Sequence, residues 1–547
     1  MKCRKCRRIL RLMFFALLHG SLPAGQFHVT PGALPSGTGT LERPWQLQIA
    51  IHHQPAVKPG DTIWVHGGVY SGQFSCSLNG TPARPIIVRS FRNERATIME
   101  PGGIWGAGIA LYGSYTWLWG LEVDSNPDSP LNAPAAGINI VGGTSSPGLK
   151  VINCIVHDQV GGGFGWWSGA TDGEINGCLV YYNGRQEGVG NNSHNYGIYL
   201  QNVSGKKLFK DNILPYNWSY AVHAYSEEGG VNRIVFEGNV MYQSGYLWRG
   251  TANERNLIIG GSALSGRDAD TLKDNHFFYH SSNNAAGERL TIGYYAPMTN
   301  LGMAGNTIVG GTMEFRVASG SVSDNTMIRT TGDAPPGNTY RPEGSGTEVF
   351  VRPNDYERGR ANIIVYNFGM DSSVSADVSS AGLSPGERYE VRDALNFYGE
   401  PVAGGTYTGE KIEIPLAGLT VAAPSGNPAG RPFHTAPEFG VFILLPPQMF
   451  PPGRSLQTTP AESGLCQNSP NPFRLTTRIA FTVPEDGDVR LDVRNTGGRS
   501  VALLVDGRMK SGTYRTIFFG RGLPSGVYIC RMKSGRHEAM RKMLLIN

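Results

Sequence analysis

Short alternations of apolar and polar residues recur along the chain, in place of long amphipathic helices. The segments INCIVH, NGCLVY, KDNILP, EGNVMY, KDNHFF, AGNTIV and SDNTMI each place a polar or cysteine residue before alternating apolar residues. A two-residue period is that of a β-strand, whose successive side chains point to opposite faces. The pattern therefore predicts many short strands.

The same segments align on a single column of equivalent positions, separated by 19 to 36 residues. The column consists of Cys154, Cys178, Asn212, Asn239, Asn275, Asn306 and Asn325. If each repeat is one coil of a solenoid, these residues stack about 4.8 Å apart. Asn side chains can then satisfy backbone groups of adjacent coils. The two cysteines lie within reach of a disulfide in this arrangement, although buried thiols are the favoured state.

Composition agrees with a β-rich chain, because 74 of the 547 residues are Gly, 35 are Pro and only 17% are charged. The first residues are different. They combine six Lys/Arg with an apolar run from Ile9 to Leu18, which predicts a signal peptide over residues 1–25. No later segment reaches about 18 uninterrupted apolar residues, so we expect no transmembrane segment.

The overall net charge of +5 is misleading. Residues 1–24 hold six Lys/Arg and no acid, and residues 465–547 hold 14 Lys/Arg against six Asp/Glu, which leaves a net charge of −9 between them. A basic face for nucleic acid is therefore not expected. After the leader five cysteines remain, with no CxxC and no His/Cys cluster at metal-ligand spacing.

The repeats, together with KPGDTIWVHGGVYSG and GTPARPIIVRSF near the N-terminus, resemble the right-handed parallel β-helix of the pectin-lyase-like superfamily. The resemblance implies a right-handed parallel β-helix over residues 26–335. The chain is thus expected to be all-β, with the solenoid followed by smaller antiparallel modules.

Two further modules are expected downstream of the solenoid. Alternating short strands predict an antiparallel β-sandwich accessory domain over residues 348–447, anchored on the β-helix by Arg352, Tyr356 and Arg360. A Pro-rich linker over residues 448–464 follows.

Residues 465–547 closely resemble the C-terminal sorting domain of the type IX secretion system. The matching residues are Asn468, Pro470, Asn471, Pro472, Phe473, Gly498, Leu523, Pro524, Ser525, Gly526, Val527 and Tyr528. An unusual thiol, Cys466, stands beside the motif. The resemblance implies export across the outer membrane through the type IX machinery, to a secreted or cell-surface location.

The segment HNYGIYLQN provides the candidate site. Strand alternation turns its Ile and Leu inward and leaves Tyr199 and Gln201 outward. The segment SYAVHAYSE follows at an offset of 24 residues, so His223 is expected over Tyr199, and Tyr225 over Gln201. Upstream, GFGWWSG brings two tryptophans to the same sheet, one of them outward.

These placements define the predicted site residues. The predicted catalytic residues are His223, Tyr199, His194 and Lys207. The predicted sugar-binding residues are Gln201, Tyr225, Trp166, Trp167, Glu227 and Arg233. Aromatic rings pack on apolar sugar faces while amides and imidazoles bind hydroxyls, so an extracellular polysaccharide is the expected partner of a monomeric protein.

A lyase is slightly favoured. A His–Tyr pair can remove and deliver protons, and a Lys or Arg can neutralise a uronic acid carboxylate, as β-elimination requires. Hydrolysis by paired acids is the competing reaction, with candidates Glu187, Glu227, Glu228, Glu237 and Asp158. A non-catalytic glycan-binding or adhesive protein is the competing class. The negative charge of the segment that precedes the C-terminal module argues against a free polyuronate.

No cofactor or metal is expected. Calcium is left open, because Asp268, Asp270 and Asp274 form a weak acidic group that more often is a solvated turn.

Overall fold

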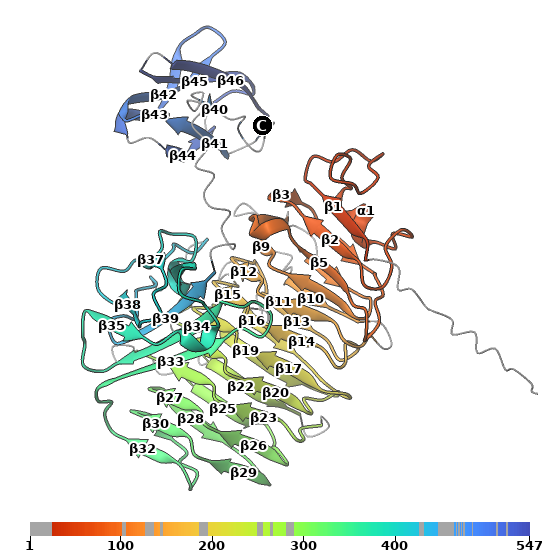
Figure 1. Ribbon diagram of the computed structural model, residues 1–547, viewed down its shortest axis with the longest axis vertical. Helices are drawn as coiled ribbons and strands as arrows, with labels where there is room; N and C mark the ends of the chain where they lie inside the picture. The colour runs from red at the N-terminus through yellow and green to blue at the C-terminus, as the bar shows by residue number, and fades with distance from the viewer. Residues whose placement is uncertain are drawn as a thin grey trace, which may run out of the picture. The chain divides into compact units, whose positions relative to one another are not determined.

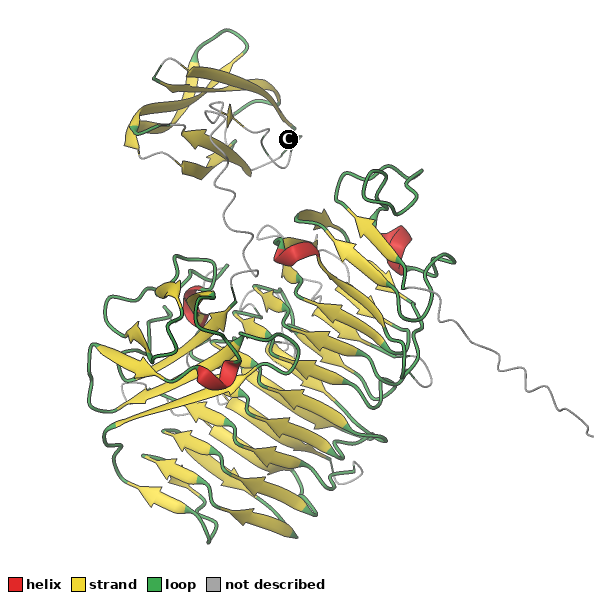
Figure 2. Ribbon diagram, in the orientation of Figure 1, coloured by secondary structure: helices red, strands yellow, loops and turns green. Residues whose placement is uncertain are grey.

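The computed structural model describes residues 24–100, 106–125, 136–142, 146–184, 195–248, 255–262, 266–280, 289–425 and 431–446, and most residues from 464 to 546. The chain divides into two compact units, Met1–Phe450 and Pro451–Asn547. Strands dominate both units (Figure 2). The helical elements are α1 (Leu47–Ile51), η1 (Phe91–Asn93), η3 (Ser379–Ala381) and η4 (Ala394–Asn396). None of the helices in the described ranges is long and apolar enough to cross a membrane.

The first unit begins with a β-helix of three long parallel sheets, which we number I, II and III in the order in which each coil visits them (Figure 1). Sheet I consists of β4 (Phe74–Cys76), β7 (Ala107–Leu111), β10 (Ala136–Ile140), β13 (Phe164–Trp166), β16 (Tyr196–Leu200), β19 (Tyr220–Ser226), β22 (Arg255–Gly261), β25 (Arg289–Tyr294), β28 (Thr312–Phe315) and β31 (Thr331–Gly332). Each strand pairs in parallel with its equivalent in the next coil, as the repeat predicted.

The other two sheets complete each coil. Sheet II consists of β1 (Gln26–Val29), β2 (Thr62–Val65), β5 (Ile86–Ser90), β8 (Thr116–Trp119), β11 (Lys150–Ile152), β14 (Glu174–Asn176), β17 (Lys207–Lys210), β20 (Ile234–Glu237), β23 (Thr271–Lys273), β26 (Leu301–Ala304) and β29 (Gly320–Ser323). Sheet III consists of β3 (Gly68–Ser71), β6 (Ala96–Glu100), β9 (Glu122–Ser125), β12 (Ile155–His157), β15 (Leu179–Tyr181), β18 (Ile213–Pro215), β21 (Val240–Tyr242), β24 (His276–Phe278), β27 (Thr307–Val309), β30 (Thr326–Ile328) and β32 (Thr339–Arg341).

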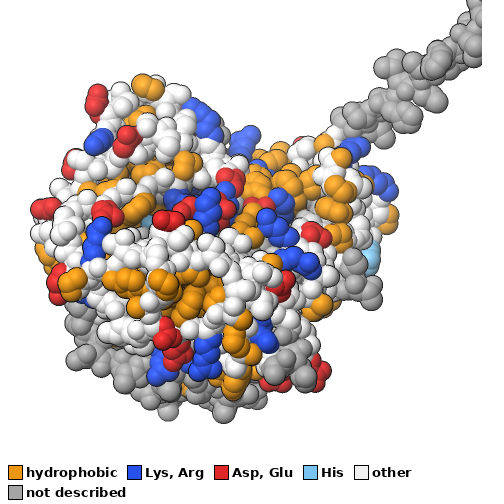
Figure 3. All heavy atoms as spheres, turned by 90° about the horizontal axis from the view of Figure 1, so that it is seen from below, with side chains coloured by type: hydrophobic (Ala, Val, Ile, Leu, Met, Phe, Trp, Pro, Cys, Tyr) orange, Lys and Arg blue, Asp and Glu red, His pale blue; other side chains and the backbone are white. Residues whose placement is uncertain are grey.

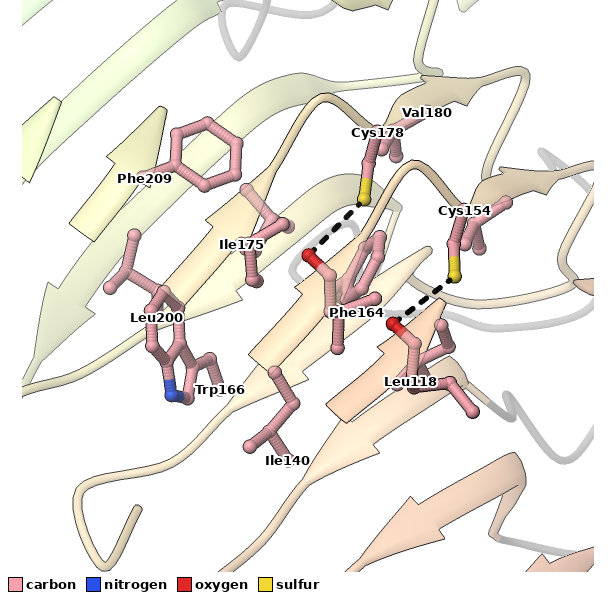
Figure 4. Close-up of a cluster of buried hydrophobic side chains, with 14 of the residues drawn as sticks. Leu118, Ile140, Cys154, Phe164, Trp166, Ile175, Cys178, Val180, Leu200 and Phe209 are labelled. Atoms are coloured by element: carbon pink, nitrogen blue, oxygen red, sulfur yellow. Dashed lines mark hydrogen bonds between the residues drawn. The ribbon is translucent and has the colours of Figure 1, made fainter. Parts of the chain in front are cut away.

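The interior of the β-helix is filled by in-register apolar columns. In sheet I one column runs through Ile138, Phe164, Ile198, Val222 and Leu257, all fully buried. Figure 4 shows part of this core, where side chains from the three sheets meet. Burial of each such side chain contributes about 1.5–3 kcal/mol relative to exposure, so alternation of buried and outward residues is strongly fixed.

The predicted Asn column is confirmed at the bend between sheets II and III. Each asparagine from Asn212 onward donates its Nδ2 to the Oδ1 of its equivalent in the next coil, over 2.7–3.0 Å, and the column extends to Asn338. Cys154 and Cys178 continue it as buried free thiols. Their Sγ atoms lie 3.9 and 3.7 Å from backbone carbonyl oxygens of preceding coils (Figure 4).

A β-sandwich, residues 347–446, follows the β-helix within the first unit. Its strands are β33 (Thr347–Pro353), β34 (Ala361–Asn367), β39 (Phe439–Leu445), β36 (Arg388–Asp393) and β37 (Ala403–Thr406) in one sheet, and β35 (Ser373–Ala376) and β38 (Ile412–Pro415) in another. It packs on the outer face of sheet III through one apolar cluster. At its centre the rings of Phe278 and Phe439 stack at 4.3 Å.

Polar contacts also fasten the sandwich to the bend between sheets II and III. The Arg352 guanidinium pairs with Asp211, the Tyr356 hydroxyl donates to Glu174 over 2.6 Å, and Arg360 donates to a backbone carbonyl 3.3 Å away. These contacts confirm the anchoring predicted for the three residues. On the face shown in Figure 3, Lys and Arg side chains likewise lie beside Asp and Glu side chains.

The second unit is a small antiparallel β-fold. Its strands are β40 (Gly464–Leu465), β41 (Thr476–Val483) and β44 (Gly512–Phe519) in one sheet, and β43 (Ser500–Met509), β42 (Gly487–Asn495), β45 (Gly526–Ser534) and β46 (His537–Leu545) in the other. Phe473, Phe518 and Tyr528 contribute to its buried core. The motif residue Phe473 is thus a core residue of this unit.

Candidate functional site

The outer face of sheet I carries a continuous row of aromatic rings, which we name the aromatic strip. It consists of Trp167, Tyr196, Tyr199, Tyr220, His223, Tyr225, Tyr294 and Tyr295, and neighbouring ring centroids lie 4.2–6.2 Å apart. The strip follows β13, β16 and β19 in successive coils, has no ring on β22 and continues at β25. Rings at these spacings attract one another in stacked or edge-to-face arrangements.

Alternation of inward and outward positions places Tyr199 and His223 in the strip, whereas Tyr196 and Tyr220 join it from the first positions of β16 and β19. Ile198 and Leu200 of β16 enter the core, and Tyr199 between them points outward. The register of β16 and β19 places His223 directly over Tyr199, as the 24-residue offset predicted. Residues far apart in the sequence therefore form one surface.

His223 is enclosed by tyrosines. Its ring stacks on Tyr220 at 4.7 Å and on Tyr225 at 5.3 Å, and meets Tyr199 edge to face at 5.2 Å. The side chain is consequently buried, with 8% of the residue exposed. This packing fixes the orientation of the imidazole relative to the Tyr199 ring.

The Tyr199 hydroxyl is held by its neighbours on the same face. It accepts a hydrogen bond from Gln201 Nε2 over 2.9 Å. Burial raises the pKa of Tyr199, the bond from Gln201 lowers it, and Tyr225 and the carboxylate of Glu227 raise it further, with a net shift above the ordinary value. Tyr199 therefore keeps its proton at neutral pH and is suited to donate a hydrogen bond or a proton.

Trp167 forms one of the two exposed ends of the strip. Its ring lies 5.3 Å from that of Tyr199, and 38% of the residue is exposed. Its indole Nε1 donates to Asn139 Oδ1 of the preceding coil over 3.4 Å. An exposed indole fixed in orientation suits the apolar face of a sugar.

The structure thus brings five predicted residues together on one face: Tyr199, Gln201, His223, Tyr225 and Trp167. Glu227 directly follows β19, and its charge raises the pKa of Tyr199 and of Tyr225. His194 and the candidate acid Glu187 lie outside the described residues.

Trp166 was predicted to contact sugar, and this placement is wrong. It is fully buried in the β-helix and in register with Ile140 and Leu200, two other core residues. Of the adjacent tryptophans only the second points outward, because strand alternation sends the first into the core.

Lys207 was predicted to be catalytic, and it is fully buried inside the β-helix. Its Nζ donates to the backbone carbonyls of Trp167 over 2.7 Å and of Gln201 over 2.6 Å, and lies 4.8 Å from the Trp166 ring. Burial lowers the pKa of this lysine well below its ordinary value. Lys207 lies two residues before Phe209 in β17 and therefore points to the same, inward side of the strand. This spacing was the signal that the sequence analysis missed.

Arg233 does not join the strip through any contact described for it. It is exposed in the turn between sheets I and II, and its Nε donates to the Gly205 carbonyl over 3.2 Å. The candidate acids Glu237 and Asp158 belong to other faces: Glu237 lies 3.9 Å from Arg352 and Lys210, and Asp158 contacts the sandwich.

The three acids considered for calcium are each engaged separately. Asp268 is exposed and bonds Thr299 and Asn300, while Asp274 lies 3.8 Å from Lys273. Asp270 is buried, its Oδ1 accepts from the Ile234 amide over 2.7 Å, and burial raises its pKa well above the ordinary value. The described residues therefore show no convergent calcium site in this turn.

A chain of polar groups on the strip's C-terminal side was not predicted. Arg255 Nε donates to Thr291 Oγ1 over 3.0 Å, and Thr291 donates in turn to Glu314 over 2.9 Å. The Arg255 guanidinium lies 5.7 Å from the Tyr294 ring. Irregular coil lengths and a register shift between β22 and β25 hid this alignment in the sequence.

Residues 27–286 match a family model described as "Pel9A-like, right handed beta helix region". The region is therefore similar to a right-handed β-helix of that kind. No curated protein sequence matches the chain significantly.

Three solved structures illustrate the likeness. "Crystal structure of pectate lyase Pel9A" is 15% identical, with 59% of this chain and 82% of that chain covered and a TM-score of 0.42. An alginate lyase from Paenibacillus sp. str. FPU-7 is 17% identical, with 55% and 93% covered and a TM-score of 0.28. XylC in complex with xylose is 10% identical, with 77% and 100% covered and a TM-score of 0.36. At these values the likenesses identify neither a substrate nor a catalytic residue.

Proposed function

We propose that the protein binds an extracellular polysaccharide along the aromatic strip and cleaves it by β-elimination. The observation that carries this proposal is the contact of His223 with Tyr199 within a row of partly exposed rings. The family model named after Pel9A, a protein whose structure is described as a pectate lyase, supports a polysaccharide as the ligand.

The two residues suit complementary proton transfers. His223 would accept the proton from C5 of a uronic acid residue while the C4–O4 bond breaks and a C4=C5 double bond forms. Tyr199 would donate its hydroxyl proton to the leaving O4. The raised pKa of Tyr199 supports the acid role, because the phenol retains its proton until the leaving oxygen needs it.

Charge favours a neutral or esterified uronate over a free one. Glu227 lies near enough to Tyr199 and Tyr225 to raise the pKa of both, so its carboxylate would repel a substrate carboxylate at this point. Lys207, expected to neutralise such a group, lies inside the β-helix. An ester withdraws electrons from C5 without needing a neutralising cation.

Tyr199→Phe and Tyr225→Phe form a matched pair of test variants, since both remove one hydroxyl from the strip. We expect Tyr199→Phe to lower the formation of unsaturated product, followed at 235 nm on a methyl-esterified polyuronate, by at least about 100-fold. Tyr225→Phe should stay within a few-fold of the parent. Equal rates for Tyr199→Phe and the parent would remove Tyr199 from the mechanism.

Glycan binding without cleavage is the second candidate, and the positions of Lys207 and Arg233 away from the strip favour it. In that case the parent releases neither unsaturated product nor reducing ends from a panel of polysaccharides. Retention on an immobilised glycan should then depend on Trp167 but not on the Tyr199 hydroxyl.

We further propose that the second unit directs type IX export and that the protein is secreted or held at the cell surface. The sequence motif over residues 465–547 and the separate compact fold of this unit support that role. Deletion of residues 465–547 should leave the remaining chain behind the outer membrane, as measured by cell fractionation. Normal surface delivery of the truncated chain would contradict the assignment.

A further inference from the structure

A second group of chemically active side chains lies far from the strip, on the outer face of sheet III. Asp124 of β9, His157 of β12 and Asp158 after β12 bring three ligand atoms within 4.8 Å of one another. His157 Nδ1 is 2.8 Å from Asp158 Oδ2 and 3.9 Å from Asp124 Oδ1. One imidazole nitrogen therefore faces two carboxylates.

The other imidazole nitrogen is held in the way that is usual for a metal ligand. His157 Nε2 lies 3.0 Å from Glu122 Oε1, and the ring stacks on Tyr181 at 4.8 Å. Histidines that bind metals almost always donate their second N–H to a carboxylate, a backbone carbonyl or water, which fixes the tautomer and the ring. In a neutral imidazole whose Nε2 proton is directed at Glu122, Nδ1 carries a lone pair on the side of Asp124 and Asp158, and a cation there would replace the 2.8 Å hydrogen bond between Nδ1 and Asp158.

Glu122 is itself fixed and neutralised by an arginine. Arg95 Nε and a terminal guanidinium nitrogen donate to its two oxygens over 2.7 and 2.6 Å, and Thr97 also donates to it. The Arg95 guanidinium is stacked 3.7 Å from the Tyr398 ring of the sandwich. Arg95 thus fixes Glu122, and Glu122 fixes the orientation of the His157 ring, without any bound ligand.

The imidazole of His157 faces more than one carboxylate. Arg95 offsets Glu122, which leaves Asp124 and Asp158 as two carboxylates beside one imidazole. An imidazolium would offset only one of them, whereas a divalent cation bound to a neutral imidazole offsets both. Asp158 is buried and Asp124 is partly exposed, so a cation bound between them would be shielded on one side and reachable from solvent on the other.

The group also lies at the seam between two domains. Asp158 Oδ1 accepts a hydrogen bond from the Ser425 amide of the sandwich over 2.5 Å, which fixes the carboxylate with its Oδ2 facing His157 Nδ1. Asp124 keeps 19% of its side chain exposed, which provides a path for an ion and room for a water ligand.

We propose that Asp124, His157 and Asp158 bind a divalent cation of the zinc type at this seam, where it fastens the sandwich to the β-helix. One imidazole with carboxylates suits Zn²⁺ and related transition ions, because Ca²⁺ and Mg²⁺ prefer oxygen ligands alone. The site lies on a different sheet from the strip, so it does not depend on the proposed polysaccharide function.

The test uses the full chain, stripped with a chelator and then dialysed against ZnCl₂. We expect one Zn²⁺ per chain by elemental analysis and a Tm several degrees higher than that of the stripped protein. Co²⁺ in place of Zn²⁺ should give visible absorption bands of nitrogen and oxygen coordination. This spectrum needs no variant, so it remains informative even where a substitution impairs folding.

Asp124→Asn is the diagnostic variant, because it removes one ligand charge while keeping the shape of the side chain. It should lose the bound Zn²⁺ and the Tm increase, whereas the matched control Asp268→Asn, in the acidic turn of another sheet, should bind as the parent does. The proposal is overturned if the parent holds no stoichiometric Zn²⁺ and shows no Co²⁺ spectrum. Unchanged binding by Asp124→Asn would also overturn it.

Discussion

The outer faces of sheets I and III are built from the same coils and are both rich in aromatic residues, yet they have different partners. On sheet III the rings of Tyr242 and Phe278 pack against Phe439 of the sandwich. On sheet I the rings pack against one another, and Trp167 and Tyr295 remain exposed. Aromatic density alone therefore does not identify a binding face; what distinguishes the two is the presence of a covering domain.

If sheet III is a structural face and sheet I a binding face, truncating an aromatic ring should destabilise the protein on sheet III and leave its stability almost unchanged on sheet I. Phe278→Ala on sheet III should lower the free energy of unfolding by about 3–5 kcal/mol, because it removes a buried ring from the seam. The matched truncation Tyr295→Ala on sheet I should change it by less than about 0.5 kcal/mol. Urea unfolding of both variants measures the difference, and similar losses would abolish the distinction.

Low pH should destabilise the protein through a buried histidine on sheet III, the face covered by the sandwich. His276 of β24 lies under the sandwich 3.2 Å from the Tyr366 hydroxyl, and burial followed by the charge of Arg352 lowers its pKa to about 3. Because the unfolded chain binds the proton more tightly, stability falls as the pH drops from about 6.5 toward 3, by about 2 kcal/mol at pH 5.

This acid sensitivity is checked by unfolding the parent and His276→Gln at several pH values. The variant should lose part of the slope between pH 6.5 and 5, whereas His52→Gln, which replaces an exposed histidine, should keep the parent slope. Parallel slopes for the parent and His276→Gln would contradict the assignment.

Lys207 lies in the interior beneath the strip, where its substitution tests how much the core supports sheet I. Lys207→Met should lower the free energy of unfolding by about 1–3 kcal/mol, since the carbonyls of Trp167 and Gln201 lose their donor. Lys206→Met, on the exposed neighbour, should have almost no effect. Denaturant unfolding of the two variants is the measurement, and a Lys207→Met variant as stable as the parent would show that water replaces the lysine nitrogen as donor.

The smallest effect on stability is expected at the exposed Trp167 end of the strip. Trp167→Ala should change the free energy of unfolding by less than about 0.5 kcal/mol and yet reduce retention on an immobilised polysaccharide. Affinity electrophoresis in a glycan-containing gel measures that retention. If Trp167→Ala and the parent are retarded equally by the glycan, Trp167 is not part of the binding surface.

Strand alternation and repeat offsets accounted for the β-helix, the Asn column and the position of His223 over Tyr199 in the next coil, because these depend on local periodicity. Trp166 and Lys207 were misplaced although the same alternation, applied strictly, sends both inward. Lysine is rarely buried, so we predicted an exposed, catalytic Lys207 although its position in the strand pattern indicates an inward side chain.

The seam could not be predicted in the same way. Asp158 meets Ser425 across 267 residues, and His157 approaches Tyr398 of the sandwich at 6.4 Å between rings. These contacts depend on how two domains dock, which no periodicity within either segment encodes. Asp158 was considered only as an acid for hydrolysis, since its partners belong to other strands and another domain.

The asparagine column has a consequence for the length of the molecule. Within the column, each asparagine accepts a hydrogen bond from the preceding coil and donates one to the following coil. A whole coil could therefore be added or removed in the middle without leaving an unpaired side-chain amide. Such a chain can vary in length by duplication of single turns.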